Sequence, residues 1–509
     1  MKPMTSDLTA TLRLAVVGHT NTGKTSLLRT LTRDPYFGRV QDSPGTTRHV
    51  EGARLLLAGA QAVELYDTPG MEDGMGLLDY LDQLSPPAQR WEGPDRILAF
   101  LDSPESTRRF EQEARVLRRL LDCDAGLYVI DVRDPVLGKH RDELAVLGLC
   151  GRPLLPVLNF THSPRQRAEE WRAALARLGL HAAVEFDSVA PPLDGESRLY
   201  DKLALMLDSR ADLLQALKED VLQQQAIRRD DALRMVAELL VDVAALRLAS
   251  KPDQADVEQA SEKLRKLVRE REDTCVRELL RRYNFRSEDF PQHALPLQGE
   301  RWGMDLFHPQ ALKDMGVHVG KGMAAGAMAG VTVDLFTAGL SLGAAALVGA
   351  MAGGLWQGAN RLGKRVMGRV QGYREITVDD AVLRLLALRQ LALVDALQRR
   401  GHAAQSPIVI DAGASPRHGY AGGNETEGHA PAGATQHVQS SAHAASDSSE
   451  SLARRALRSG KLPTELAEAR SQPHWSNLSP DYEEDSTRRE DVVRSLARWL
   501  SSIDMEPAG

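Results

Sequence analysis

The sequence predicts an α/β domain with a mainly parallel sheet flanked by helices over residues 10–209, followed by an all-α C-terminal half with a Gly/Ala-rich helical hairpin. Three observations support this prediction. Short apolar runs alternate with helical stretches at first, long charged-apolar patterns without glycine follow, and a segment dominated by small residues comes later. A chain of 509 residues is too long for one hydrophobic core, so we expect about two to four structural units.

The predicted sheet is inferred from six apolar runs. The first run, LRLAVV at residues 12–17, stops at Gly18, and an amphipathic stretch starts near Lys24. This order is typical of strand, loop and helix. Five further runs occur at residues 54–58, 62–67, 125–132, 153–159 and 182–186. Because helical stretches separate the later runs, we expect a parallel sheet with helices on its faces.

The C-terminal half is expected to be helical. Residues 210–314 are predicted to contain two long helices, an antiparallel pair on either side of Pro252. The remaining segments are a Gly/Ala-rich hairpin at 315–374, a helix at 375–402, a disordered linker at 403–450 and a helical segment at 451–509. The linker consists largely of Gly, Ala, Ser and His, which cannot bury enough surface to order themselves.

The composition excludes some classes of protein. A net charge of −7 gives no electrostatic reason to expect binding to phosphate backbones, so we predict no nucleic-acid partner. Cys123, Cys150 and Cys275 have no metal-ligand spacing and cannot all pair, which fits a reduced compartment. The N-terminal stretch has no long apolar run ending at a small-residue cleavage site. We therefore predict a cytoplasmic protein.

The stretch GHTNTGKT fits the phosphate-loop pattern G-x-x-x-x-G-K-[ST]. Backbone N–H groups and the helix N-terminus would form an anion cradle, Lys24 would supply positive charge, and the hydroxyl of Thr25 would bind Mg²⁺. The predicted nucleotide-binding residues of this loop are Gly18, His19, Thr20, Asn21, Thr22, Gly23, Lys24, Thr25 and Ser26.

Two further stretches follow the loop in the order that a GTPase requires. DTPG ends an apolar run, so Asp67 would lie at the carboxyl end of a strand and organise the Mg²⁺ shell, while Gly70 leaves backbone room near the γ-phosphate. SPGTTRH, at residues 43–49, lies between the helix and the next strand. One of its threonines could complete the metal shell.

Together these three stretches resemble an Era-like GTPase of the translation-factor-related class over residues 10–209. The resemblance implies GTP and GDP as ligands, hydrolysis of GTP to GDP and phosphate, and Mg²⁺ held with Thr25, Asp67 and Thr47, with Thr46 as the alternative to Thr47. The whole layout also resembles a bacterial family of uncharacterised GTPases whose C-terminal half has no assigned function.

The sequence departs from this family where the base is read. Such GTPases carry Asn-Lys-x-Asp at the end of a late strand, whereas Asn159 is followed here by Phe160, Thr161 and His162. A carboxylate accepts two hydrogen bonds from guanine, and a neutral imidazole accepts one at most. Ser188, in EFDSVA, matches a base contact of the family. Guanine selectivity stays open.

The residue after DTPG is Met71, which cannot orient the attacking water as glutamine does in many GTPases. Relatives with an apolar residue there include members that bind K⁺ through an asparagine at the position of Asn21. The resemblance therefore implies slow turnover, accelerated by K⁺ and by a G-domain homodimer or a partner. In the alternative interpretation, Asn21 only caps the loop.

The Gly/Ala segment allows two interpretations. Its small residues recur four apart, a spacing that lets helices approach closely in membranes, and a basic cluster follows at residues 361–374. The 22 residues from Leu335 to Trp356 would reach about 33 Å as a helix, enough to span a bilayer. The segment is either a hairpin associated with membrane lipid at the inner membrane or a hairpin buried in a soluble domain.

These observations leave three functions. The first is a slow GTPase that acts as a nucleotide-dependent switch at the inner face of the membrane. The second is a nucleotide-gated scaffold with negligible hydrolysis. The third is a ribosome-assembly GTPase, which the acidic charge and the lack of a recognisable RNA module disfavour.

Overall fold

A computed structural model describes residues 11–34, 37, 51–57, 60–84, 91–285, 306–307, 331–333, 373–404, 457, 462–484 and 486–504. The chain divides into two compact units. The first comprises Met1–Arg228, Tyr283–Asp289 and Leu397–Ser406, and the second comprises Arg229–Arg282, Phe290–Ala396 and Pro407–Gly509.

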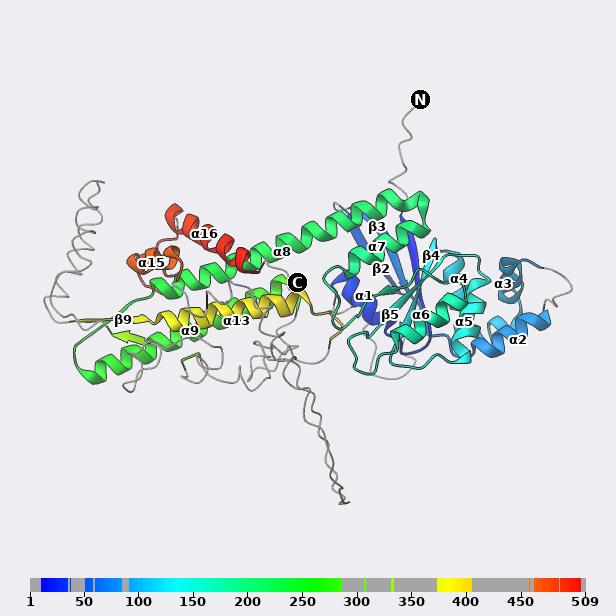
Figure 1. Cartoon of the computed structure of the whole chain (residues 1–509), viewed down its shortest axis with the longest axis horizontal. Helices are drawn as coiled ribbons and strands as arrows, with labels where there is room; N and C mark the ends of the chain where they lie inside the picture. Colours follow the sequence, from blue (N-terminus) through cyan, green and yellow to red (C-terminus); the bar gives the residue numbers. More distant parts are fainter. Residues whose placement is uncertain are drawn as a thin grey trace, which may run out of the picture. The chain divides into compact units, whose positions relative to one another are not determined.

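The first unit is built on a six-stranded sheet with the strand order β2-β3-β1-β4-β5-β6. Figure 1 labels β2, β3, β4 and β5 of this sheet. Its strands are β1 (Leu12–Val17), β2 (Glu51–Leu57), β3 (Ala60–Asp67), β4 (Ala125–Asp131), β5 (Leu154–Asn159) and β6 (Val184–Glu185). Only the pair of β2 and β3 is antiparallel. The predicted mainly parallel sheet is confirmed, although β6 is shorter than the predicted run at 182–186.

Helices cover both faces of this sheet. Successive side chains of β1 point to opposite faces of the sheet. Leu12, Leu14 and Val16 therefore pack in one core, while Ala15 and Val17 pack in the other. The first core is completed by α1 (Lys24–Thr32), α7 (Gly195–Met206) and the start of α8 (Ala211–Ala245). The second contains α2 (Gly74–Leu84), α3 (Gly93–Leu101), α4 (Glu111–Leu121), α5 (Gly138–Gly148) and α6 (Ala168–Arg177).

The second unit is mainly helical. The later part of α8 runs antiparallel to α9 (Gln254–Arg282), because Asp231 pairs with Arg282 near one end of the contact and Asp242 pairs with Arg271 further along. This confirms the predicted antiparallel pair. The other α-helices in the described part of this unit are α13 (Asp380–Gln398), α15 (Thr464–Ser471) and α16 (Thr487–Asp504).

A buried ion cluster joins three helices of the second unit. Asp242 of α8 is fully buried and lies 2.9 Å from both Arg271 of α9 and Arg489 of α16. Its carboxylate also accepts the backbone N–H of Asn477 at 3.2 Å. Because burial of a charge is costly unless it is paired, this cluster ties the C-terminal helices to the α8–α9 pair.

A small antiparallel sheet corrects the prediction of an all-α C-terminal half. β7 (Leu248–Ser250), β9 (Arg374–Val378) and β8 (Val331–Val333) pair in that order. β8 lies within the segment predicted as a helical hairpin, where two valines flank a threonine in a strand-favouring run that the Gly/Ala-rich surroundings obscured. Most of that hairpin, and of the predicted linker at 403–450, lies outside the described residues.

Within the described ranges, no helix combines the length and the apolar character needed to cross a bilayer. The 22-residue run from Leu335 to Trp356, on which the membrane interpretation depends, is outside those ranges.

Candidate nucleotide site

The candidate site starts at the loop between β1 and α1. Gly18 and Gly23 have φ angles of +141° and +89°, conformations that L side chains rarely adopt. A Cβ on Gly18 would lie 2.6 Å from the carbonyl oxygen of Val129, and one on Gly23 would clash with the side chain of Asn159. No acidic residue lies in the first turn of α1. The loop therefore has the shape and polarity of an anion cradle.

Lys24 folds back over this loop. Its Nζ donates to the carbonyl oxygens of Gly18 at 3.0 Å and of His19 at 2.6 Å. Burial lowers the pKa of the Lys24 ammonium to about 8, while the carboxylates of Asp67 and Glu143 oppose the shift. A bound polyphosphate would add negative charge beside Lys24 and favour its charged form.

The predicted metal residues lie together where the structure describes them. Thr25 Oγ1 donates to Asp67 Oδ2 at 2.5 Å, and Asp67 ends β3 with 1% of its surface exposed. A hydroxyl and a carboxylate are hard oxygen donors, which suit Mg²⁺. Thr46 and Thr47 are outside the described residues.

The DTPG segment packs tightly against the loop. Met71 N donates to Gly18 O at 3.2 Å, and His19 pairs with Met71 in a parallel bridge. A Cβ on Gly70 would lie 2.7 Å from Thr20 N, so only glycine fits there. The side chain of Met71 is fully buried in the core. The oxygen Thr20 Oγ1 is buried and has no hydrogen-bond partner in the described part of the chain.

Two residues of the predicted site lie at its margin. Asn21 is exposed and has a left-handed φ of 66°, which asparagine tolerates better than most residues. Ser26 is half-buried in the first turn of α1.

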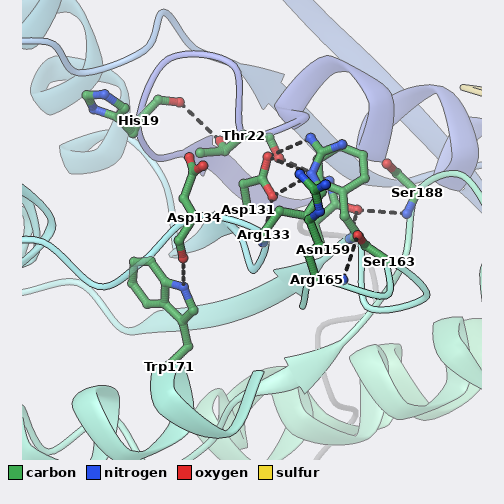
Figure 2. A network of polar contacts seen from close by, with 11 residues as sticks. His19, Thr22, Asp131, Arg133, Asp134, Asn159, Ser163, Arg165, Trp171 and Ser188 are labelled. Atoms are coloured by element: carbon green, nitrogen blue, oxygen red, sulfur yellow. Dashed lines mark hydrogen bonds and ion pairs between the residues drawn. The ribbon is translucent and has the colours of Figure 1, made fainter. Parts of the chain in front are cut away.

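Asn159 connects the phosphate loop to the loops after β5 and β6. Its Nδ2 donates to Thr22 O at 3.0 Å, and its Oδ1 accepts from Phe160 N at 2.9 Å and from Ser188 N at 2.8 Å. Figure 2 shows Asn159 between Thr22 and Ser188. The structure therefore brings Asn159 and Ser188 together beside the phosphate loop.

An aromatic ring lies beside this junction. Phe160 has a left-handed φ of 61°, a strained conformation of the kind that clusters at functional sites. The guanidinium of Arg133 lies 3.9 Å from the centre of the Phe160 ring and pairs with Asp131. The hydrogen-bonded pair of Asp131 and Arg133, which Figure 2 shows, thus holds Arg133 over one face of the ring.

Asp187 is a site residue that the sequence analysis missed. Its Oδ2 accepts from His162 N at 3.0 Å and lies 3.3 Å from His162 Nδ1, while its Oδ1 accepts from Val189 N and Ala190 N. The sequence signal was an acidic residue directly before Ser188, at the end of a strand.

A second missed group lies on the other side of the loop. Glu143 of α5 is 1% exposed, and its Oε1 lies 2.6 Å from His19 Nδ1. Tyr128 OH donates to Glu143 Oε2 at 3.0 Å, and Lys139 Nζ lies 2.8 Å from His19 Nε2. The ring of His19 therefore carries its proton on Nδ1 and accepts at Nε2. Burial, with the Glu143 carboxylate, raises the pKa of Tyr128 well above its ordinary value.

Comparison with known families agrees with this geometry. Residues 13–159 match the family described as 50S ribosome-binding GTPase. The phosphate loop and DTPG fall within this match, so the first unit contains a GTP-binding GTPase domain of the P-loop type.

Residues 172–434, just over half of the chain, match a domain of unknown function, DUF3482. The chain belongs to the DUF3482 family. The match to this family begins within α6, so it includes Asp187 and Ser188 as well as α9 and α13 of the second unit, and it ends before α15 and α16. The Era-like subclass is a narrower assignment than these matches give.

Two solved structures illustrate the similarity. A bacterial selenocysteine-specific elongation factor is 16% identical, with a TM-score of 0.25 over 39% of this chain and 29% of its own. A protein from Thermus thermophilus is 19% identical, with a TM-score of 0.21 over 33% and 22%. The chain thus spans less than a third of either structure. No curated protein matches it.

Proposed function

We propose that this DUF3482 protein is a nucleotide-dependent switch that binds Mg²⁺–GTP in the first unit and hydrolyses it slowly. The observation that carries the proposal is the placement of Lys24 over the glycine loop together with the hydrogen bond from Thr25 to Asp67. These are the groups that hold polyphosphate and the metal ion in P-loop proteins. Gly18 to Ser26 would contact the phosphates, and Gly70 would approach the γ-phosphate.

In the proposed reaction, the oxygen of a water molecule attacks the γ-phosphorus, and the bond to the oxygen that bridges the β- and γ-phosphates breaks. Mg²⁺, when bound through Thr25 with Asp67 and Thr47, supplies positive charge to the phosphate oxygens. Lys24 adds a second positive charge. Met71 is buried and apolar, so it offers no group to orient the water, and we expect slow turnover.

Phosphate release by the full chain tests this function. The wild type should release phosphate from GTP slowly and only with Mg²⁺, and Lys24→Ala should abolish release. The matched control Lys251→Ala removes an exposed lysine and should leave the rate unchanged. Wild-type protein that binds GTP without measurable release would instead support a nucleotide-gated scaffold, which the buried Met71 also favours.

Two further parts of the proposal concern activation and location. Asn21 is exposed to solvent in the phosphate loop, so its side chain is accessible to a K⁺ ion or to a second G domain in a homodimer. Equal rates of phosphate release in K⁺ and Na⁺ would remove the potassium role.

Residues 315–374 would place the protein at the inner face of the membrane. Flotation with liposomes tests this role. If deletion of residues 315–374 does not reduce the amount of protein that floats with the liposomes, the segment has no such role.

A further inference from the structure

The loops after β5 and β6 form a polar arrangement beside the phosphate loop. Asn159 ties them to Thr22, so they border the cradle on one side. In open α/β sheets, ligands bind in the crevice outside the carboxyl ends of the strands. If the first unit binds a nucleotide, as proposed above, the part beyond the phosphates lies over these two loops.

The chemistry of the loops suits a flat ring with a polar edge. Phe160 lies against the phosphate loop, because a Cβ on Gly23 would come 3.0 Å from its Cζ. Ser188 Oγ is buried and, within the described residues, has no hydrogen-bond partner. An aromatic surface and an unused hydroxyl are groups that bind nucleobases by stacking and by hydrogen bonds to the base edge.

Asp187 fixes the tautomer of the exposed His162 ring at this edge. The side chain of Asp187 is 3% exposed, whereas that of His162 is 62% exposed. Both oxygens of Asp187 accept backbone N–H groups, so the carboxylate acts only as an acceptor. Its contact with His162 Nδ1 therefore requires a proton on Nδ1, and in the neutral ring this leaves a lone pair on Nε2.

We propose that His162, held in this tautomer by Asp187, reads the edge of the purine base. Nε2 accepts the N1–H of guanine or hypoxanthine. Adenine carries a lone pair at N1, which would face the lone pair of Nε2. His162 is then a specificity-determining residue, and Asp187 is a positioning residue that acts through it.

This assignment gives a specificity different from that of a carboxylate at the same place. A carboxylate accepts both from N1–H and from the exocyclic amine of guanine, while one imidazole nitrogen accepts only once. The protein should therefore separate 6-oxopurines from adenine but hardly separate guanine from hypoxanthine.

Displacement of a fluorescent GDP analogue from the full chain by GDP, IDP and ADP tests the proposal. For wild type, we expect GDP and IDP to agree within about threefold and ADP to bind at least about tenfold more weakly. His162→Ala should weaken GDP and IDP equally, by about tenfold. His162→Asp should restore a second acceptor and raise the preference for GDP over IDP to about tenfold.

Asp187→Asn tests the role of the tautomer. The amide can donate to Nδ1 and move the ring proton to Nε2, so GDP and IDP should weaken together while their ratio stays the same. The control for His162→Asp is His181→Asp, which replaces another exposed histidine of the first unit by aspartate. It should alter neither the affinity for GDP nor that for IDP.

The outcomes separate this proposal from the function on which it depends. If wild type binds none of the nucleotides, the proposed function fails. If wild type binds GDP but His162→Ala binds GDP, IDP and ADP as wild type does, only the role of His162 fails. If wild type prefers GDP over IDP by more than about tenfold, the proposed role of His162 also fails. Thermal melting verifies the folding of each variant, and Asp187→Asn retains the test if His162→Ala does not fold.

Discussion

Glu143 shows how a single buried residue supports the phosphate loop. Its carboxylate lies 2.6 Å from His19 Nδ1 and accepts from Tyr128 OH, so it joins the loop to β4 and α5. A Cβ on Gly74 would lie 2.9 Å from its Cγ, so the first turn of α2 packs against the same side chain. Glu143 thus links the loop to the helix that follows DTPG.

Glu143→Gln should destabilise the protein. The amide keeps the size of the side chain but loses a charge that two donors stabilise, at a cost of about 1–3 kcal/mol in the free energy of unfolding. Urea denaturation measures this change. Asp142→Asn, its more exposed neighbour on α5, should have a much smaller effect, and equal effects of the two variants would contradict the role given to Glu143.

The three cysteines are buried and protonated. Burial raises the pKa of Cys123, Cys150 and Cys275 to about 12, from an ordinary value of 9.0. Native protein at pH 8 should therefore not react with Ellman's reagent, while denatured protein should release three equivalents. Because these pKa values are higher in the folded state, their contribution to stability is present below pH 9 and is lost as pH rises toward 12. Reaction of a native thiol would contradict this burial.

Part of the candidate site could be predicted from the sequence, because its residues lie close together in the chain. Lys24 contacts the phosphate loop, and Thr25 contacts Asp67 at the start of DTPG, so the structure brings these predicted residues together. Asp187 and Glu143 were missed, since their contacts with His162 and His19 join residues 25 and 124 positions apart. Such contacts depend on strand order, which local patterns do not fix.

At the scale of helices and strands, the buried Asp242 organises the second unit. It pairs with Arg271 and Arg489, each at 2.9 Å, and thereby joins α8, α9 and α16. The paired carboxylate raises the pKa of Arg271 despite its burial. Neither arginine can lose its partner without leaving a buried charge.

Asp242→Asn should therefore destabilise the second unit strongly. Breaking a buried ion pair costs about 3–5 kcal/mol, because the two arginines lose the buried carboxylate that pairs with both. Urea denaturation followed by far-UV circular dichroism measures the loss. Asp230→Asn changes an exposed carboxylate of the same helix and should cost almost nothing; similar losses for both would argue against the cluster.

The elements that the sequence predicted well are those with a strong period. β1 alternates between two cores, and α8 and α9 are long patterns without glycine. β8 has only three residues and pairs with β9 43 positions later, so no local pattern marked it. β6 has only two residues because its length is set by its pairing with β5 and not by the length of its apolar run.

At the scale of the whole chain, a late segment belongs to the first compact unit. Gly401 N donates to Val189 O at 2.8 Å, and Thr30 Oγ1 donates to Ser188 O at 2.8 Å. His402 stacks on Phe285, with ring centres 4.6 Å apart. The loop that carries Ser188 is therefore held by Thr30, 158 positions earlier in the chain, and by Gly401, more than 200 positions later.

Gly401→Ala should disturb this loop. A Cβ at Gly401 would lie 2.8 Å from the carbonyl carbon of Ser188, so either the loop or residue 401 must move. We expect the affinity for GDP to fall by about tenfold, or about 1.4 kcal/mol. Gly148→Ala adds a Cβ in open space and is the matched control for a glycine substitution. An unchanged affinity in Gly401→Ala would show that the late segment does not support the site.

The proposed function requires that the first unit hold Mg²⁺–GTP through Lys24, Thr25 and Asp67. Equilibrium titration of GTP into the full chain, with Mg²⁺ and with EDTA, measures this binding. We predict saturable binding that EDTA weakens by at least about tenfold and that Lys24→Ala reduces by about 100-fold or more. Binding that Lys24→Ala leaves unchanged, or no binding by wild type, would contradict the proposed function.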